Sequence, residues 1–583
     1  MTAAAIAARF RPCPTTALKV ERNAELLIRV HAVSAVVSMI FGVIGAFGLV
    51  LTRWQAVHLL SAVWYYRLLT VHGLSMLIFF IVFFEMAVLY FAGAVLLNAR
   101  AVAPKLGWAG WLMMVVGAVL VEVMVWTGKA DVLFTSYPPL KADPNYYLGI
   151  ILFAVGALIT TGLYFANILT AKKERTYEGA VPLVVFGATT AAVIAVITLL
   201  HGAIIYIPTW TWAMGWTRMP DPEVYRMIWW GLGHSSQQIN VAAMVSIWYF
   251  LGAMTVGGVV INEKISRSAF FLYVLFISMA SAHHLLVDPG MGPAWKIWNT
   301  SYAMYLAVLA SMIHGFTVPA GLEAGMRLRG YTKGMFEWLT KAPWGDPGFS
   351  AMIFSIVMFG FIGGITGVTF GTEQINIIVH NTLRVPGHFH ATVVAGTALA
   401  FMGVTYYVIP LIFRKQVAFW PIAKIQPYLF AIGMTLFTMS MTFAGTFGVP
   451  RRHYDISFAG AALSVQYNPA VDLLLAIMGI GGLLAATAVT FYIVIAAWSV
   501  FFGKALPVDA KPDMAMGFHG VPQGVLRLPK QVHGREAGEA ETPAHEHAMH
   551  VRGTYVLVGV FLAAFVVYYF VNWKLISFVW KVG

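Results

Sequence analysis

Six histidines of this 583-residue chain lie within or at the ends of strongly apolar stretches, where their side chains could bind metal. They are His72, His234, His283, His284, His388 and His390. Imidazole is a ligand for copper, zinc, iron and haem iron, and a polar group inside a membrane suggests a function by its cost alone. A lone histidine of this kind is more simply a hydrogen-bonded packing residue, so the spacing of the six must decide between these interpretations.

The adjacent pair His283-His284 is difficult to explain by packing. Neighbouring residues of an α-helix point about 100° apart, so the two rings do not fill one packing position. Both can turn toward one metal if the helix end is irregular. With His234 they make a set of three imidazoles, which suits copper, zinc or non-haem iron.

The pair His388-Phe389-His390 has a different geometry. Residues i and i+2 of a helix lie about 200° apart, on opposite faces. One metal cannot readily use both rings, but two flat cofactors on either side of the helix can each take one. Haem iron accepts imidazole axially, and His72 could complete a bis-histidine, low-spin site. The other haem would be five-coordinate and would face the three-histidine metal.

The elements that must position these side chains are membrane-spanning helices. The chain is 60% hydrophobic and 10% charged, whereas a soluble protein carries about 25% charged residues. Lipid offers no partner to an unpaired backbone amide, so the predicted fold class is all-α and polytopic. About 20 apolar residues span a bilayer, which predicts about thirteen helices: 26–51, 68–97, 108–126, 147–169, 181–207, 224–259, 269–286, 298–320, 351–370, 388–413, 427–447, 471–502 and 554–569.

The basic residues between these helices predict their orientation. Lys and Arg concentrate in alternate connections, so the positive-inside rule favours an inner N-terminus and an outer C-terminus. The same rule explains the net charge of +13 without nucleic acid. The predicted parts are a cytoplasmic segment 1–24, a twelve-helix core 25–502, a polar cytoplasmic loop 503–552 and a thirteenth helix with the C-terminus, 553–583. The six histidines then share one depth in the outer half of the membrane.

Two further features limit the chemistry. The single cysteine, Cys13, excludes an internal disulfide, a cysteine-ligated iron–sulfur cluster and a two-thiolate copper centre in this sequence. The polar loop carries His545, His547 and His550. A flexible solvated segment explains this cluster more simply than a metal site does.

Six motifs together carry a family resemblance. In chain order they are YPPLK (137–141), WWGLGH (229–234), AHH (282–284), DPGMGPAWK (288–296), HNTLRVPGHFH (380–390) and VPRR (449–452). They resemble subunit I of the haem–copper oxidase superfamily, and most of all its B-type (ba-type) oxygen reductases, which have thirteen helices. The resemblance implies a bacterial or archaeal cytoplasmic membrane.

The resemblance also implies roles for individual residues. His72 and His390 would ligate a low-spin haem, expected to be b-type, and His388 a high-spin haem of b or a type. His234, His283 and His284 would hold iron or copper. Arg451 and Arg452 would pair with haem propionates, for which a guanidinium fork is suited, with His380 near the same groups. Trp229 and Trp230 would be pocket walls or simply structural.

The sequence departs from the B-type pattern at one position. Those enzymes place a tyrosine four residues after the first metal-binding histidine, on the same helix face, and cross-link it to that histidine. Gln238 occupies this position here, and Ile277 occupies the position from which C-type oxygen reductases bring a tyrosine. The phenol supplies an electron and a proton when O–O is broken in one step, and glutamine supplies neither.

Nitric oxide reduction, 2 NO + 2 e⁻ + 2 H⁺ → N2O + H2O, needs no such phenol. The superfamily's nitric oxide reductases place a glutamate at the position of Gln238, and glutamine is isosteric with it. The sequence therefore predicts a respiratory nitric oxide reductase acting in denitrification. The alternatives are an oxygen reductase that lacks the tyrosine, an NO dismutase, and a haem-bearing transporter or gas sensor without turnover.

Proton and electron supply are the remaining expectations. Tyr249 and Ser311 match hydroxyl positions of the B-type proton channel, whereas His314 replaces a threonine and Val245 a tyrosine, so the path could be altered. Three carboxylates are other candidate relays: Glu85, Glu122 and Glu373. Because the sequence lacks the cysteines of a dinuclear copper site, a cupredoxin-like or cytochrome subunit should donate the electrons.

Overall fold

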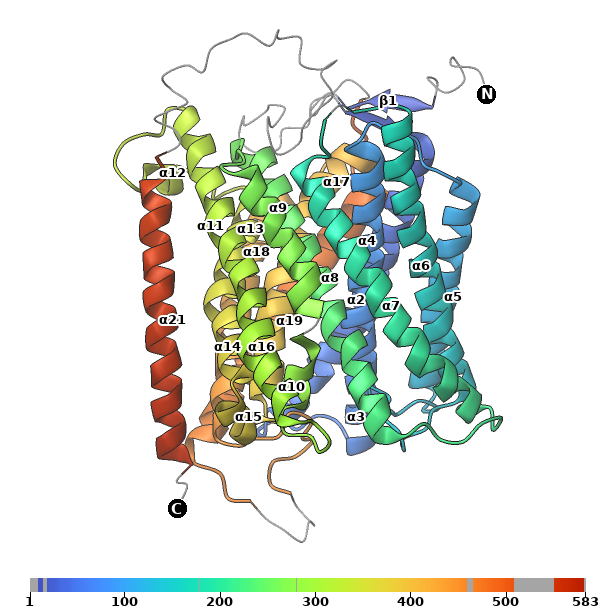
Figure 1. Cartoon of the computed structure of the whole chain (residues 1–583), viewed down its shortest axis with the longest axis vertical. Coiled ribbons are helices and arrows are strands. Elements are labelled where there is room, and N and C mark those ends of the chain that lie inside the picture. Colours follow the sequence, from blue (N-terminus) through green and yellow to red (C-terminus); the bar gives the residue numbers. More distant parts are fainter. Residues whose placement is uncertain are drawn as a thin grey trace.

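The computed structural model describes residues 9–13, 18–177, 179–278, 280–458, 465–507 and 550–580. Long helices run side by side between two opposite ends of the molecule (Figure 1). Among the described residues, twelve are long and apolar enough to cross a membrane: α2 (Arg22–Arg53), α3 to η2 (Ala62–Val95), α5 (Pro104–Trp126), α6 (Pro144–Lys173), α7 (Leu183–Ala213), α8 (Pro222–Val256), α10 with η5 and α11 (Pro293–Leu328), α13 to α14 (Pro347–Gly371), α16 to η8 (Arg384–Phe413), α18 (Trp420–Thr446), α19 (Ala470–Phe502) and α21 (Arg552–Val579). The all-α, multi-pass prediction is confirmed.

The helix predicted at 269–286 differs from the others. Its residues form short consecutive pieces, namely α9 (Glu263–Leu272), the π-helix η3 (Tyr273–Ile277) and the 3₁₀-helix η4 (Ala280–Leu285). None of these alone is long enough to count as a span. Twelve long helices and this one broken segment together agree with the predicted count of about thirteen. The 3₁₀-helix η4 contains His283 and His284, which can turn toward one metal only if the helix is irregular there.

Several long helices contain π-helical turns. The clearest is η7 (His390–Ala398), which follows the short helix α16 (Arg384–Phe389). Such turns add a residue to the helix and occur often at functional sites. Here the transition falls between His388 and His390, the two histidines predicted to serve different cofactors.

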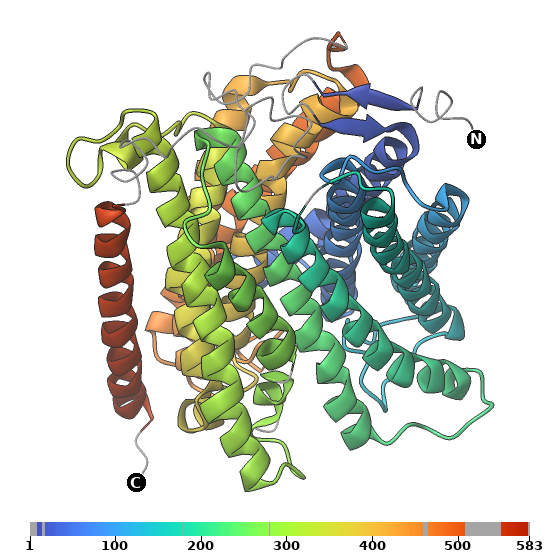
Figure 2. The same ribbon diagram turned by 45° about the horizontal axis from the view of Figure 1, so that its top comes forward.

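The helices differ in how deeply they are packed. The most apolar window of α8 is 100% buried, whereas the corresponding window of α21 is 6% buried. Figures 1 and 2 show α21 standing at the edge of the bundle. At the contact of α18 with α19, a Cβ on Gly433 would lie 2.5 Å from the Ala485 backbone nitrogen, so only glycine allows this approach.

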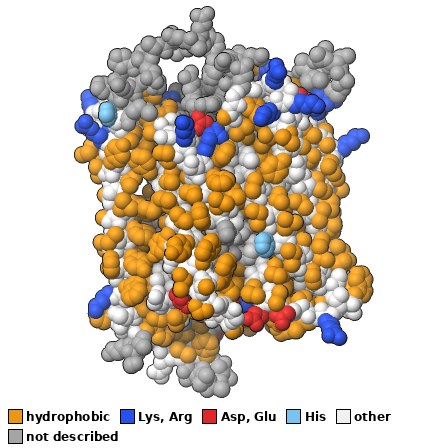
Figure 3. Space-filling view, viewed as in Figure 1, with side chains coloured by type: hydrophobic (Ala, Val, Ile, Leu, Met, Phe, Trp, Pro, Cys, Tyr) orange, Lys and Arg blue, Asp and Glu red, His pale blue; other side chains and the backbone are white. Residues whose placement is uncertain are grey.

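The outer surface matches a membrane protein. Apolar side chains cover the belt between the two ends, and most Lys and Arg side chains visible on this face lie near the rims (Figure 3). A two-stranded antiparallel sheet of β1 (Phe10–Pro12) and β2 (Lys19–Glu21) precedes α2. This sheet and the far end of α21 lie at opposite ends of the bundle (Figure 1), as an odd number of crossings requires.

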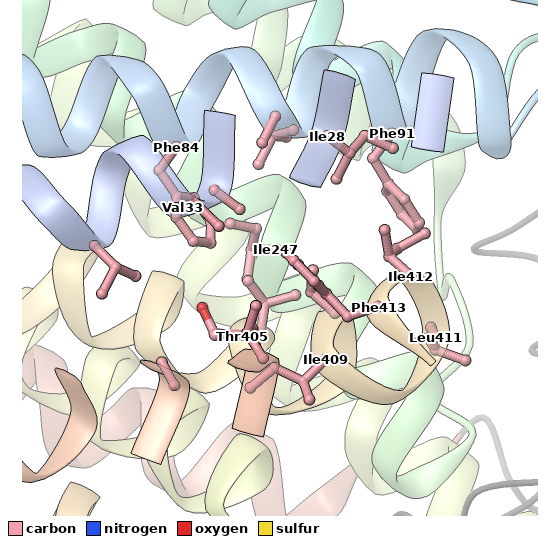
Figure 4. Close-up of a pocket in the computed structure, with 18 of the residues that line it drawn as sticks. Ile28, Val33, Phe84, Phe91, Ile247, Thr405, Ile409, Leu411, Ile412 and Phe413 are labelled. Atoms are coloured by element: carbon pink, nitrogen blue, oxygen red, sulfur yellow. The ribbon is translucent and has the colours of Figure 1, made fainter. Parts of the chain in front are cut away.

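One apolar cavity lies between α2, α4 (Ile81–Tyr90), α8, η8 (Ile409–Phe413) and α19. Its lining includes Ile28, Phe84, Ile247 and Phe413, and Thr405 contributes a hydroxyl group (Figure 4). None of the six predicted ligand histidines lines this cavity. It therefore has no part in the site described next.

Candidate active site

Three histidines from two elements meet at one point. His234 comes from α8, and His283 and His284 come from η4. One ligand atom from each lies within 4.8 Å of the other two, and His284 Nε2 lies 3.3 Å from His234 Nδ1. A tetrahedral metal with bonds of about 2 Å holds its ligands about 3.3 Å apart, so the spacing fits one shared ion. Iron and copper both accept three imidazoles.

Aromatic stacking fixes one of these rings. The Trp230 and His284 ring centroids are 3.7 Å apart and their planes differ by 5°. Trp230 and His234 lie four residues apart on α8, hence on one face. The same helix face therefore orients both a ligand of its own and a ligand from η4. The sequence alone suggested only a pocket wall or a purely structural role for Trp230.

A second pair of histidines faces across another cavity. His72, on α3 (Ala62–Leu74), and His390 have ring centroids 6.3 Å apart and planes that differ by 9°. Two imidazoles bound axially to one metal at about 2 Å each would place their centroids about 6 Å apart. Their Nδ1 atoms donate to Gly42 O at 2.9 Å and Pro386 O at 2.7 Å, so Nε2 is the ligand atom that remains. This geometry fits a bis-histidine haem.

His388 points away from His390, toward α14 (Ile365–Gly371). Its Nδ1 donates to Gly363 O at 3.0 Å and lies 3.1 Å from Thr366 Oγ1, which again leaves Nε2 as the ligand atom. A Cβ on Gly367 would lie 2.7 Å from His388 Cε1, so glycine gives the ring its place. The two histidines of one helix thus serve two different cavities.

The cavity at His388 has a volume of about 510 Å³ and reaches all three histidines of the metal cluster. A flat haem on His388 and a metal on the cluster would therefore share one space. Gln238 lines this space, and no tyrosine lies among the described residues that line it. This extends the sequence argument, because no tyrosine from another described helix takes the missing position.

Gln238 contacts His234 directly. Its amide Nε2 lies 3.1 Å from His234 Nε2, and its buried Oε1 has no hydrogen-bond partner. The oxygen and nitrogen of an amide are assigned by their surroundings. An imidazole that binds metal through Nδ1 carries its proton on Nε2 and needs an acceptor there. The amide oxygen is suited to be that acceptor.

A polar cavity of about 400 Å³ lies next to these sites, and its lining includes Arg451, Arg452 and His380, which lie outside the candidate membrane spans. Burial, together with the Arg452 charge, lowers the pKa of Arg451 to about 9. Burial lowers the pKa of His380 to about 4, and neither ring nitrogen has a hydrogen-bond partner. Among the described residues neither arginine has a carboxylate partner, so the cavity fits carboxylates brought by a ligand, such as haem propionates.

The predicted proton-path residues form one polar cluster. The Tyr249 hydroxyl lies 3.1 Å from His314 Nδ1, 2.7 Å from Thr317 Oγ1 and 3.1 Å from Ser266 Oγ. Ser311 lines the His388 cavity and lies 3.0 Å from the Tyr273 hydroxyl, while Tyr273 and His314 stack with centroids 5.5 Å apart.

The sequence did not single out Tyr273, Thr317 and Ser266, which also belong to this cluster. Thr317 stands at helical spacing from a predicted member, because it is three residues after His314. That spacing was the available signal. Val245 is buried and lies outside these hydrogen bonds.

The three candidate carboxylates are separated. Glu85 is buried on α4, and with its amide turned the Asn240 nitrogen donates to Glu85 Oε1 at 2.7 Å and to Ser236 O at 3.1 Å. Glu122 accepts from Ser75 Oγ and Trp126 Nε1. Glu373 pairs with Lys296 at 3.2 Å and is partly exposed. Of the three, only Glu85 is hydrogen-bonded to α8 near Gln238, through Asn240 two residues further along the helix.

Most of the polar loop, which the sequence predicts to be flexible and solvated, lies outside the described residues. His545 and His547 lie outside the described residues, and His550 is exposed just before α21.

Comparison with known proteins agrees with this fold. The sequence family described as cytochrome c and quinol oxidase polypeptide I matches residues 29–484. Cytochrome c oxidase subunit 1 of Thermus thermophilus is 31% identical over 429 residues, covering 70% of this chain and 74% of that protein. Cytochrome c oxidase subunit 1 of Synechocystis is 25% identical over 473 residues, covering 76% and 77%.

A solved structure shows the same architecture. A haem–copper terminal oxidase dimer studied by cryo-electron microscopy has a TM-score of 0.79 and 25% identity, covering 93% of this chain and 92% of that one. The fold and the site define a membrane oxidoreductase that binds haems and a further metal. The chain belongs to the haem–copper oxidase subunit I family. Members of this family act in respiratory electron transport together with other oxidase subunits.

Proposed function

We propose that this chain is the catalytic subunit of a respiratory nitric oxide reductase. The observation that carries the proposal is the cavity shared by His388 and the three-histidine cluster. Gln238 lines it at the position next to His234, and the described lining contains no tyrosine. A site without a phenol lacks the residue that supplies an electron and a proton to O–O cleavage. NO reduction needs two electrons and two protons and no oxidisable side chain.

A terminal oxygen reductase is the second candidate. The similar proteins are named cytochrome c oxidase subunit 1, and those names support oxygen reduction better than NO reduction. Both candidates require two haems and a further metal, and they differ in the gas that is reduced at a site where Gln238 takes the place of the tyrosine. We favour NO because the difference falls on a residue that touches a proposed metal ligand.

The residues divide the work between two haems and one metal. His72 and His390 would hold the low-spin haem, His388 the high-spin haem, and His234, His283 and His284 the iron or copper. When bound, the high-spin haem and this metal supply two neighbouring redox centres for a small gaseous substrate. Gln238 would hold the His234 ring in the tautomer that presents Nδ1 to the metal. Arg451, Arg452 and His380 would receive the haem propionates.

The chain's own hydroxyl groups would deliver the protons. The Tyr249 hydroxyl contacts His314, and the Tyr273 hydroxyl contacts Ser311 in the wall of the cavity at His388. The stacked rings of His314 and Tyr273 bring these two pairs together. A proton carried to Ser311 enters the space where NO is consumed. Electrons would reach the low-spin haem from a cupredoxin-like or cytochrome subunit.

Turnover of the purified complex with each gas tests the proposal. Under anaerobic conditions, with a chemical electron donor, we expect one N2O for every two NO consumed, measured by mass spectrometry. The same preparation should consume O2 more slowly at an electrode. A His283→Ala variant serves as the blank. Brisk O2 uptake without N2O would reject NO reduction and favour the oxygen reductase.

A further inference from the structure

A buried guanidinium without a negative partner lies one helical turn before His388. Arg384 is the first residue of α16 and of a candidate membrane span, and it is 0% exposed. Arginine remains protonated in proteins, and a buried charge without a countercharge is costly enough to suggest a function. None of the carboxylates in the described part of the chain forms an ion pair with it.

The side chains that accept hydrogen bonds from the Arg384 guanidinium in the described structure are all neutral. One terminal nitrogen donates to Thr446 Oγ1 at 3.1 Å, and the other to Thr369 Oγ1 at 3.2 Å and to Asn572 Oδ1. The Nε atom is buried without a hydrogen-bond partner. These contacts join α14, α18 and α21 around the guanidinium. They satisfy part of its hydrogen bonding but leave its charge uncompensated.

Arg384 does not face a cofactor cavity. The next residue, Val385, lines both the cavity at His388 and the polar cavity of Arg451 and Arg452, whereas Arg384 lines neither. A role in binding a haem propionate therefore belongs to Arg451 and Arg452. The charge of Arg384 can act on a haem only through the protein.

Hydrogen bonds connect Arg384 to the His388 imidazole. Thr369, which accepts from Arg384, donates to Thr366 O at 2.9 Å. Thr366 Oγ1 in turn lies 3.1 Å from His388 Nδ1. Arg384 and His388 are also four residues apart, on one face of the helix. Groups that hydrogen-bond to a metal ligand change the properties of the metal, including its reduction potential. A nearby charge buried in a protein interior of low dielectric constant also changes that potential.

We propose that Arg384 raises the reduction potential of the haem on His388. A fixed positive charge stabilises the reduced iron relative to the oxidised iron, because reduction lowers the positive charge nearby. The inference rests on the proposed ligation of the high-spin haem by His388 and holds for either substrate. Arg384 is thus a positioning and tuning residue, and it touches neither substrate nor haem.

A purely structural role for Arg384 gives a different expectation. If the guanidinium only holds α21 against the bundle through its hydrogen bond to Asn572, its charge should not affect the haem potential as long as the contacts remain. The test must therefore change the charge and keep the contacts.

Asn572→Asp makes this change with nearly the same shape. Asn572 Oδ1 already accepts from Arg384, so the aspartate would supply the missing countercharge in place. In a spectroelectrochemical titration of the purified complex, we expect the midpoint potential of the high-spin haem to become more negative. The low-spin haem should shift less. Asn572→Ser, which keeps an acceptor without charge, is the matched control and should leave both potentials near the wild type.

Two further variants keep the inference testable if Asn572→Asp does not assemble. Arg384→Lys retains the charge and should keep the wild-type potential, whereas Arg384→Gln should shift it in the negative direction. Equal potentials in the charged and neutral variants, with both haem spectra intact, would overturn the tuning role. A separate His388→Ala variant tests the proposed ligation of the high-spin haem by His388, on which the inference rests. Retention of the high-spin spectrum there would reject His388 as the ligand, whatever the potentials show.

Discussion

The two cavities on either side of α16 use the same residue type for opposite purposes. Between His72 and His390 the protein offers an imidazole to each side of a flat cofactor, with ring centroids 6.3 Å apart. In the other cavity His388 offers one imidazole. The three further imidazoles in the wall of this cavity, those of His234, His283 and His284, lie close to one another and could share one metal. A metal with both axial positions filled passes electrons, whereas an open position binds substrate. With the proposed haem ligation, the number of histidines that face each haem would separate the haem that transfers electrons from the haem that binds substrate.

Removing a histidine of the cluster should have the largest effect. His234→Ala deletes one of three metal ligands, so we expect loss of the non-haem metal and a fall in turnover of more than about 100-fold. Elemental analysis and N2O production measure the two losses. The spectrum of the low-spin haem should stay unchanged, because His72 and His390 belong to the other cavity. Loss of that spectrum as well would show that the two cavities are not independent.

Changing Gln238, which contacts the His234 ring, should have the next largest effect on turnover. Gln238→Leu removes the amide but keeps much of its volume, so the His234 ring would lose its acceptor. We expect NO turnover to fall by about 10-fold to 100-fold, the range seen when groups that orient a metal ligand are lost. Gln238→Glu is the matched control, since it keeps an acceptor at the same place. Wild-type activity in Gln238→Leu would contradict the proposed role.

The proton cluster should matter only to the catalytic cavity. Tyr249→Phe removes a hydroxyl that contacts His314, Thr317 and Ser266, and we expect turnover to fall by about 10-fold or more. Stopped-flow reduction of the low-spin haem should keep its rate. The control is Tyr492→Phe, which removes a buried hydroxyl that contacts Thr405, away from this cluster. Equal slowing by both variants would remove the case for a proton path at Tyr249.

Glu85 should show the smallest effect. Its carboxylate meets Asn240 rather than the Tyr249 cluster, and a glutamine can keep that hydrogen bond. We therefore expect Glu85→Gln to slow steady-state NO turnover less than Tyr249→Phe does. A larger loss in Glu85→Gln, with both haems present, would move the proton path to the side of α4.

Much of the architecture followed from composition and spacing. Apolar stretches of bilayer length predicted the helices, and i, i+2 spacing predicted that His388 and His390 serve different cavities. The broken segment at 263–285 was not predicted, because hydropathy does not distinguish a straight helix from π and 3₁₀ pieces. The Tyr273 and Thr317 hydroxyls were missed because a polar residue in a span does not reveal which neighbour it meets.

The sequence by itself determined the solvent, the helices and the kinds of ligand available, because these depend on residue type and on local periodicity. Only the tertiary structure decided which side chains meet. Arg384 lies in a motif visible in the sequence. The sequence does not show that the side chain beside its guanidinium is the neutral Asn572, 188 residues away. Likewise, the absence of a tyrosine from the described wall of the catalytic cavity depends on every helix that reaches it. Contacts between distant segments depend on packing, and packing is a property of the whole bundle.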